Sequence, residues 1–337
     1  MKIDIYNHIF PKRFYDSMME VMSNPKDMLK RVTSVPMLVD LDERFRVMDR
    51  FKDYCQVLSL ASPPMEMLVG PARAPEFARM ANDGMAELVR KHPDRFPAFV
   101  ASVGLGNPVE AVKEMHRAIK ELGAKGIQIF TNVGGRPLDE PDFLPIFEGM
   151  AAYDLPLWMH PTRGPSFADY PGQKKSKYEI WWTLGWPYET SAAMAHLAFA
   201  GLFDKLPNLK IITHHMGGMM PYFEGRIGPG WDQMGSRTSD EDYAALLKSL
   251  KKRPIDYMRM FYADTALFGA ASATKCGLDF FGVDHVVFAS DAPFDPEKGP
   301  MYIRETIRVI DGLDIPAKDK AQIYEGNARR LLKLPAH

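Results

Sequence analysis

The strongest constraint on the fold is a regular alternation of short apolar runs with longer amphipathic segments. Eight runs have the length and the β-branched composition of buried strands. They are Lys2–Tyr6, Cys55–Ala61, Ala98–Val103, Gly126–Phe130, Pro156–His160, Lys210–His214, Met260–Asp264 and Val286–Ser290. Segments between them have apolar residues at the three- and four-residue spacing of helices with one buried face. They include Glu76–Lys91, Pro108–Leu122, Asp142–Tyr153, Ser191–Lys205 and Pro300–Asp311.

Strands that alternate with helices form a parallel sheet with the helices outside it. Eight such units close into a (β/α)8 TIM barrel of about 250 residues. The 337 residues therefore predict one α/β barrel domain over 1–337, with insertions at about 14–49 and 162–189. A doubly wound open sheet would show a glycine-rich turn after its first strand, but Asn7–Pro11 contains no glycine.

Charge and cysteine content narrow the possible partners. Lys and Arg total 42 against 43 Asp and Glu, so the charge gives no reason to expect nucleic acid or an anionic membrane as partner. Two cysteines exclude a disulfide scaffold and a cysteine-rich zinc module. The sequence shows no signal peptide and no 18-residue apolar run. We therefore expect a cytoplasmic protein that binds a small molecule.

Ionisable side chains follow several predicted strands at the point where each strand ends. His8 lies beyond the first run, His160 ends the fifth and Asp291 follows the eighth. These ends share one mouth of a parallel barrel, and burying such groups without partners costs several kcal/mol each. Imidazole and carboxylate are ligands for Zn²⁺ or a similar divalent ion, and three of them leave a fourth position for water. Zinc is expected first, and manganese, cobalt or iron would suit the same ligands.

Side-chain alternation predicts which residues face this mouth. Residues two apart in a strand point to the same side. The alternation places Asp4, Tyr6 and His8 in the barrel interior, and it places Ile3, Ile5 and Ile9 against the surrounding helices. It also allows only one of His214 and His215 to point inward.

Eight groups of motifs occur in one order along nearly the whole chain. They are Met1–Asp4 with His8–Pro11; Val112–Met115 and Glu121–Gly123 before Gly126–Ile129; Leu157–Pro161; Gly185–Thr190; Phe203–Lys210; His215–Gly218 through Pro221 to Gly225–Ile227; Phe261–Asp264; and Ser290–Phe294. Together they resemble the amidohydrolase superfamily, in the branch of aminocarboxymuconate-semialdehyde decarboxylase and related non-oxidative decarboxylases.

The resemblance implies a metal centre and its partners. His8, His160 and Asp291 would bind one catalytic metal ion, and His215 would act as acid or base on the water that the metal holds. In the muconate-semialdehyde relatives His215 would activate this water, whereas in the phenolic-acid relatives Asp291 would deliver the proton to the ring carbon, and the sequence leaves both routes open. The family usually has His-x-His after the first strand, whereas this chain has Tyr6–Asn7–His8. Tyr6 could ligate the metal as a phenolate. Alternatively, it could hydrogen-bond to substrate or to the water, which is the interpretation that we favour.

Three further residues take roles by the same resemblance. Trp182 would face the substrate from the insertion at 162–189, and Phe294 would lie beside Asp291. Arg226 would reach a substrate carboxylate in the neighbouring subunit of a homodimer. The position of Arg31 is close to that of another substrate-binding arginine, but the match is too loose to assign it.

The leading hypothesis is a metal-dependent decarboxylase of a small aromatic or muconate-like carboxylic acid. The alternative is a hydrolase that uses the same metal on a lactone, an amide or a C–C bond. A third hypothesis is a barrel that has lost catalysis and only binds a small molecule. Keeping four buried polar groups, His8, His160, His215 and Asp291, without a ligand would be costly, which argues against the third hypothesis.

Overall fold

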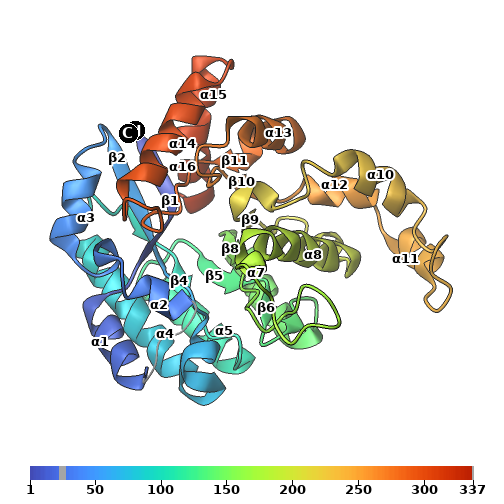
Figure 1. Cartoon of the computed structure of the whole chain (residues 1–337), viewed down its shortest axis with the longest axis horizontal. Helices are drawn as coiled ribbons and strands as arrows, with labels where there is room; N and C mark the ends of the chain where they lie inside the picture. The colour runs from blue at the N-terminus through green and yellow to red at the C-terminus, as the bar shows by residue number, and fades with distance from the viewer. Residues whose placement is uncertain (23–27, 336–337) are drawn as a thin grey trace.

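The computed structural model describes residues 1–22 and 28–335. Eight strand positions form a closed parallel barrel in this part of the chain (Figure 1). Around the ring they are β1 (Lys2–Ile9), β2 (Tyr54–Leu60), β3 (Ala98–Phe99) continued by β4 (Ala101–Ser102), β5 (Ile127–Phe130), β8 (Leu157–His160), β9 (Ile211–Thr213), β10 (Tyr262–Asp264) and β11 (Val286–Val287). The ring closes where Ile5 N donates to Phe288 O at 3.0 Å and His8 N donates to Ala292 O at 2.7 Å. The predicted TIM barrel is confirmed.

Helices follow the strands and surround the barrel (Figure 1). The main ones are α4 (Met65–Lys91), α5 (Pro108–Lys120), α6 (Leu144–Tyr153), α8 (Gly185–Phe199), α13 (Ala271–Phe281) and α14 (Pro300–Gly312). Helix α5 shows why such segments are helical, because Asn107 caps its first turn and one apolar stripe is buried. The predicted helix Ser191–Lys205 is divided instead. The left-handed backbone of Gly201 (φ 71°) separates α8 from the short helix α9 (Leu202–Lys205).

In β1 the side chains that point into the barrel differ from those that strict alternation predicted. Asp4 pairs with Gln56 and Asn7 pairs with Leu58, so β1 has one residue more than β2 between these pairs. This β-bulge lets Ile5 and Tyr6 both face inward, and Ile3 packs in the same interior cluster. Asp4 was predicted to face inward as well, but its carboxylate instead accepts hydrogen bonds from Tyr54 and Ser290. The prediction was wrong for Ile3, Asp4 and Ile5, because strict alternation assumes a regular strand and does not allow for a bulge.

The first insertion packs a buried arginine against β1. It contains α1 (Lys12–Val21), α2 (Met28–Val32), the 3₁₀ turn η1 (Pro36–Leu38) and α3 (Leu41–Met48). Arg44 of α3 is 0% exposed. Its guanidinium donates to Asn7 Oδ1 at 3.2 Å, to Gln56 Oε1 at 2.6 Å and to the carbonyl oxygens of His8 and Met37. Arg44 thus holds the backbone at the residue where β1 delivers His8.

Replacing Arg44 with methionine should lower the free energy of unfolding by about 3–5 kcal/mol. The substitution keeps most of the side-chain volume, but it leaves Asn7, Gln56 and the His8 carbonyl without their donor. Urea denaturation followed by circular dichroism measures the loss. Arg46→Met is the control, because Arg46 is on the same helix with a side chain 65% exposed. A loss below 1 kcal/mol for Arg44→Met would contradict this role.

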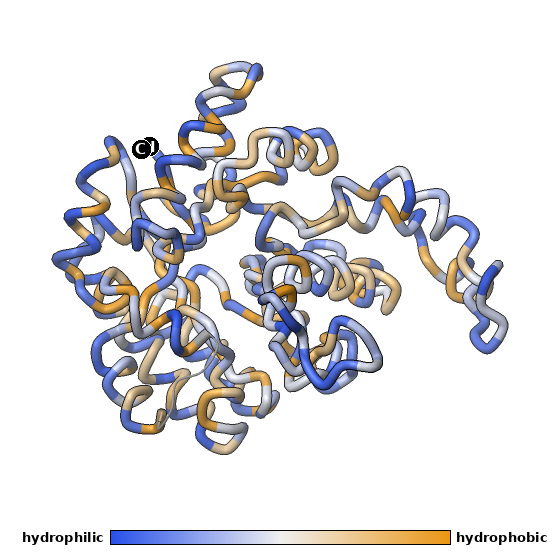
Figure 2. The backbone as a smooth tube through the Cα atoms, viewed as in Figure 1, coloured by the Kyte–Doolittle hydropathy of each residue, from blue (hydrophilic) through white to orange (hydrophobic). Residues whose placement is uncertain are grey.

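Later segments cover the two ends of the barrel and extend beyond it. The second insertion continues from β8 through residues 162–179, largely hydrophilic in Figure 2, to α7 (Ile180–Thr183). A β6–β7 hairpin (Asn132–Val133 with Arg136–Pro137) follows β5. Helices α10 (Glu224–Asp232), α11 (Tyr243–Ser249) and α12 (Pro254–Met258) project to one side in Figure 1.

Two short 3₁₀ turns precede other elements: η2 (Pro141–Phe143) precedes α6, and η4 (Val283–His285) precedes β11.

The last helices of the chain pack against the barrel. After α14 come α15 (Ala317–Ala321), the π-helical segment η5 (Gln322–Gly326) and α16 (Asn327–Leu332). Leu331 and Leu332 of α16 pack with Ile3 and Val287 in the interior cluster. Among the helices of the described residues, none has both the length and the hydropathy required to cross a membrane.

Candidate functional site

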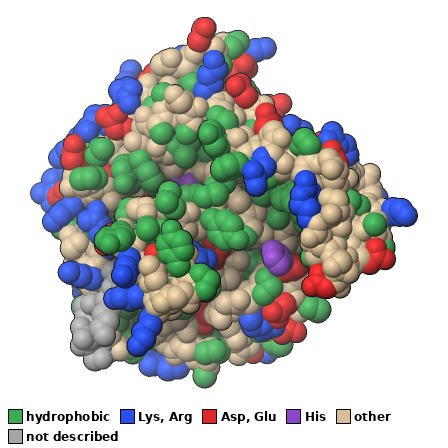
Figure 3. Space-filling model, turned by 45° about the vertical axis from the view of Figure 1, so that its right-hand side comes forward, with side chains coloured by type: hydrophobic (Ala, Val, Ile, Leu, Met, Phe, Trp, Pro, Cys, Tyr) green, Lys and Arg blue, Asp and Glu red, His purple; other side chains and the backbone are tan. Residues whose placement is uncertain are grey.

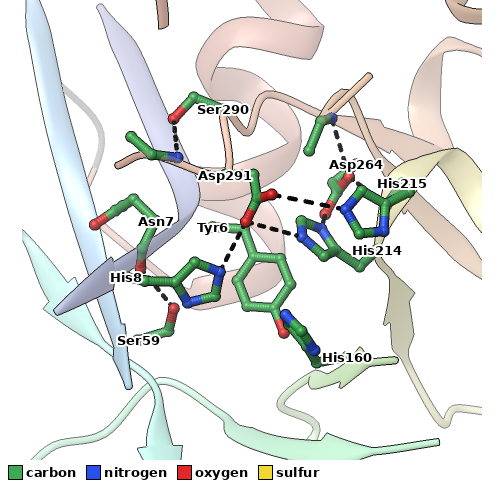
Figure 4. A network of polar contacts seen from close by, with 12 residues as sticks. Tyr6, Asn7, His8, Ser59, His160, His214, His215, Asp264, Ser290 and Asp291 are labelled. Atoms are coloured by element: carbon green, nitrogen blue, oxygen red, sulfur yellow. Dashed lines mark hydrogen bonds and ion pairs between the residues drawn. The ribbon is translucent and has the colours of Figure 1, made fainter. Parts of the chain in front are cut away.

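Four histidines and one aspartate meet at the carboxyl end of the barrel (Figure 4). His8 ends β1, His160 ends β8, His214 and His215 follow β9, and Asp291 follows β11. All five residues are buried. One ligand atom from each of His8, His160 and His214 lies within 4.8 Å of the others, and the same holds for His214, His215 and Asp291. Two overlapping sets of potential metal ligands therefore share His214.

Asp291 is the common partner of three imidazoles. Its Oδ1 atom lies 2.9 Å from His8 Nε2 and 3.3 Å from His214 Nε2, and its Oδ2 atom lies 3.7 Å from His215 Nε2. The backbone N–H of Asp291 donates to the carbonyl of Tyr6 at 3.0 Å, which fixes the residue beside β1. Burial alone would raise the pKa of Asp291, but the neighbouring His214, His215 and His8 hold it well below its usual range. Asp291 is therefore a carboxylate at neutral pH.

His160 is a neutral imidazole with one ring nitrogen free. Its Nδ1–H donates to the carbonyl oxygen of Pro161 at 2.5 Å, so the proton is on Nδ1 and the Nε2 lone pair is free. Burial, His214 and His8 lower the pKa of His160 well below its ordinary value. A buried neutral imidazole with a fixed tautomer is the form that binds a divalent metal.

Both histidines after β9 lie in the site, although alternation allowed only one. Strand β9 ends at Thr213, before either of them. The backbone then turns through left-handed conformations at His215 (φ 55°) and Met216 (φ 53°). The two imidazole rings lie side by side with centroids 3.7 Å apart. The prediction that one points away was wrong, because alternation applies only while the chain remains a strand.

Tyr6 lies at the centre of the histidines. Its ring is 4.2 Å from the ring of His214 and 5.2 Å from that of His8. Its hydroxyl is buried and has no hydrogen-bond partner among the residues that the structure describes. Burial, together with Asp264 and Asp291, raises the pKa of Tyr6 well above its ordinary value. Tyr6 is thus a neutral phenol with an O–H free to donate.

Aromatic side chains surround the histidines. Phe130 and Trp186 lie with ring centroids 5.5 and 5.4 Å from His160, Phe268 lies 5.5 Å from His215, and Phe294 lies 5.4 Å from His8. In Figure 3 hydrophobic side chains gather on this side of the molecule, and part of a histidine shows between them. We call the side chains of Phe130, Trp186, Phe268 and Phe294 the aromatic wall. Flat faces of this kind suit a planar ligand.

The predicted residues Trp182, Phe294 and Arg226 occupy different places. Phe294 lies in the aromatic wall beside Asp291 and His8. Trp182 lies behind Trp186, 6.3 Å from its ring, and donates to Glu179 at 2.9 Å. Arg226 is exposed on the projecting helix α10 and makes no ion pair within residues 1–22 and 28–335. The structure therefore brings Phe294 to the histidines directly and Trp182 only through Trp186.

Sequence reasoning missed four residues of the site and left a fifth unassigned. The side chains that contact the cluster but received no role are His214, Phe130, Trp186 and Phe268. Arg31, which the sequence could not assign, donates to the backbone carbonyls of Phe294 at 2.7 Å and Asp295 at 3.2 Å. It therefore anchors the loop that follows Asp291.

Comparison with known proteins gives consistent matches. Residues 3–334 match a family model described as amidohydrolase. A 2-amino-3-carboxymuconate-6-semialdehyde decarboxylase of Dictyostelium discoideum is 28% identical over 99% of this chain and 92% of its own. A gamma-resorcylate decarboxylase of Polaromonas sp. is 32% identical over 88% of this chain and 89% of its own. A crystal structure of 5-carboxyvanillate decarboxylase from Novosphingobium aromaticivorans, with bound manganese and 3-methoxy-4-hydroxy-5-nitrobenzoic acid, superposes with a TM-score of 0.85. Its sequence is 28% identical, over 99% of this chain and 97% of that one.

Proposed function

Because this chain belongs to the amidohydrolase family, we propose that it is a metal-dependent, non-oxidative decarboxylase of a small aromatic carboxylic acid. The observation that carries the proposal is the convergence of His8, His160, His215 and Asp291 inside an aromatic wall. The relatives support it, because both related enzymes and the superposed structure are decarboxylases of carboxylates.

In this proposal His8, His160 and Asp291 hold one divalent metal ion. The donor set of imidazole and carboxylate fits such an ion. Buried atoms without partners among the described residues, Nε2 of His214 and the hydroxyl of Tyr6, also fit a ligand at this place. When bound, the ion would stabilise negative charge on the oxygens of the substrate. Zinc is the metal that the ligand set first suggests, and manganese, which the related 5-carboxyvanillate decarboxylase binds, is the other candidate.

The protein's own residues supply the substrate site and the proton. The aromatic wall stacks on the ring of the substrate, and the O–H of Tyr6 donates to one of its oxygens. When CO₂ leaves, the electrons of the C–C bond go to the ring carbon, which must then accept a proton. Asp291 is a carboxylate and has to take up a proton before it can deliver one. His215 is the source that we propose, because it is not a metal ligand in this proposal and its Nε2 lies 3.7 Å from Asp291 Oδ2.

The experiment that tests the proposal is CO₂ release from a panel of carboxylates. The panel contains gamma-resorcylate, 5-carboxyvanillate, 2-amino-3-carboxymuconate-6-semialdehyde and benzoate. We expect release of one CO₂ per product formed from at least one hydroxylated ring acid, and none from benzoate, which lacks a neighbouring oxygen. Incorporation of ¹⁸O from labelled water into a carboxylate product, without CO₂, would favour the hydrolase instead.

We also propose that the protein acts as a homodimer and that Arg226 serves the site of the neighbouring subunit. Arg226 is exposed on α10, in the group of helices that projects beyond the barrel (Figure 1). Exposed Tyr222 and Phe223 precede it. A two-fold pair is the commonest assembly of soluble proteins. That Trp182 faces the substrate also remains a prediction, and in the structure its ring packs against Trp186.

A further inference from the structure

His214 has no assigned role, yet it is fully buried in the middle of the cluster. Its ring centroid lies 5.2 Å from that of His160 and 4.2 Å from that of Tyr6. Figure 4 shows the ring directed at Asp291, between His215 and Tyr6. A side chain that only filled space here could be apolar, so the imidazole requires an explanation.

The tautomer of His214 is fixed by Asp264. His214 Nδ1 lies 2.5 Å from Asp264 Oδ2. The other carboxylate oxygen, Oδ1, accepts the backbone N–H groups of His215 at 3.0 Å and Ala266 at 3.1 Å. Because the carboxylate can only accept hydrogen bonds, it holds a proton on Nδ1. Histidines that ligate metals almost always donate their second ring nitrogen to a carboxylate or carbonyl in this way.

The other nitrogen of His214 points into the site without a partner. Nε2 is buried and makes no hydrogen bond with any residue in the described part of the chain. It lies 3.3 Å from Asp291 Oδ1, the same oxygen that His8 Nε2 approaches to 2.9 Å. His8 Nε2 and Asp291 Oδ1 form a hydrogen bond in the structure. One ligand atom from each of His8, His160 and His214 lies within 4.8 Å of the others, so a divalent ion that replaced the protons of this group would be within reach of all three imidazoles.

We propose that His214 is a third imidazole ligand of the divalent ion, held by Asp264, together with His8, His160 and Asp291. The inference rests on the proposed metal-dependent function. It explains how the site can dispense with a histidine at position 6. The imidazole is supplied from the end of β9, and Tyr6 packs its ring against that imidazole instead of ligating the ion. His215 remains free to handle protons.

The test counts the imidazole nitrogens on Mn²⁺ bound to the intact protein. Electron spin echo envelope modulation of the wild-type protein loaded with Mn²⁺ alone should show three coordinated imidazoles, and the His214→Ala variant should show two. Two imidazoles in the wild type, or three in the variant, would overturn the proposal. The wild-type spectrum gives an answer even if the variant does not fold.

Affinity for Mn²⁺, measured by competition with a fluorescent chelator, gives a second readout. We expect binding at least about 100-fold weaker in His214→Ala, and about 10- to 100-fold weaker in Asp264→Asn, which keeps His214 but weakens its support. His196→Ala is the control, because the side chain of His196 is 54% exposed on α8 and should leave affinity unchanged. Wild-type affinity in His214→Ala would overturn the inference and leave the proposed function standing. Three imidazoles on Mn²⁺ with no CO₂ release from any carboxylate would overturn the function alone.

Discussion

Replacing Asp291 with asparagine should lower kcat for CO₂ release at least about 10³-fold. Asparagine keeps the size of the side chain but removes the charge that the three histidines surround at 2.9, 3.3 and 3.7 Å. The same change removes one ligand of the ion and one group that can carry the proton. Steady-state rates on the best acid of the panel measure the effect.

Two matched variants separate these roles. Asp284→Asn changes an exposed aspartate at the opposite end of the same strand and should leave kcat unchanged. His215→Asn should lower kcat about 100-fold while the metal content stays at the wild-type level, because His215 handles the proton and is not a ligand. Retention of kcat within tenfold in Asp291→Asn would refute the assignment of Asp291.

Removing the metal with a chelator should abolish CO₂ release and lower Tm by at least about 5 °C. Without an ion, Asp291 keeps its contacts with His8 Nε2 at 2.9 Å and His214 Nε2 at 3.3 Å, but the stabilisation that metal binding gives to the folded protein is lost. An ion present at 100 times its Kd stabilises the folded protein by about 2.7 kcal/mol. Each kcal/mol shifts Tm by roughly 2–4 °C in a large domain.

The matched control for metal removal is the Asp291→Asn protein. It has already lost a ligand, so chelation should change its Tm by less than about 2 °C. Adding back Zn²⁺ or Mn²⁺ separately to the wild-type protein should restore both activity and Tm, and the relative rates identify the better metal. Full activity in the wild-type protein after complete removal of metal would contradict the proposed chemistry.

The fold could be predicted because parallel strands buried on both faces are continuous apolar runs. The runs that became β1, β2, β5 and β8 differ from the observed strands only at their ends. It was harder to predict which side chains of a strand point into the barrel. The bulge at Ile5 and Tyr6 adds one residue to β1, and nothing in the amino-acid composition of the strand reveals it. Strict alternation therefore predicted that Asp4 faces the barrel interior, whereas in the structure its carboxylate faces outward and accepts a hydrogen bond from Ser290.

The sequence predicted the site residues that lie at the ends of strands. It did not predict the arrangement of the residues in the turn that follows β9. His8 and His160 are among the last residues of β1 and β8, and Asp291 comes soon after β11, so the common mouth of a barrel brings them together. His214 has an extended backbone (φ -76°, ψ 154°) and continues the alternation of β9 from the interior residue Ile212. It received no role because the resemblance assigned the site to His215, and the left-handed backbone at His215 and Met216, which brings both rings into the site, was not predicted. The pair Gly217–Gly218, also at positive φ, was the available signal of a tight turn there.

Two other positions show what sequence spacing cannot decide. Trp182 and Trp186 are four residues apart and their rings contact each other, so the sequence could not tell which one meets His160. Arg44 is a charged residue in an amphipathic segment, which normally predicts exposure. Its burial is possible because Asn7, Gln56 and the carbonyls of His8 and Met37 accept hydrogen bonds from its guanidinium.

The most direct test of the central claim is the metal content of each protomer, measured by elemental mass spectrometry on protein purified without chelator or added metal. A metal-dependent site built from His8, His160, His214 and Asp291 predicts about one equivalent of a divalent transition metal, and that equivalent should be lost in the Asp291→Asn protein. Protein that holds no metal, and takes up none when Zn²⁺ or Mn²⁺ is supplied, would contradict it.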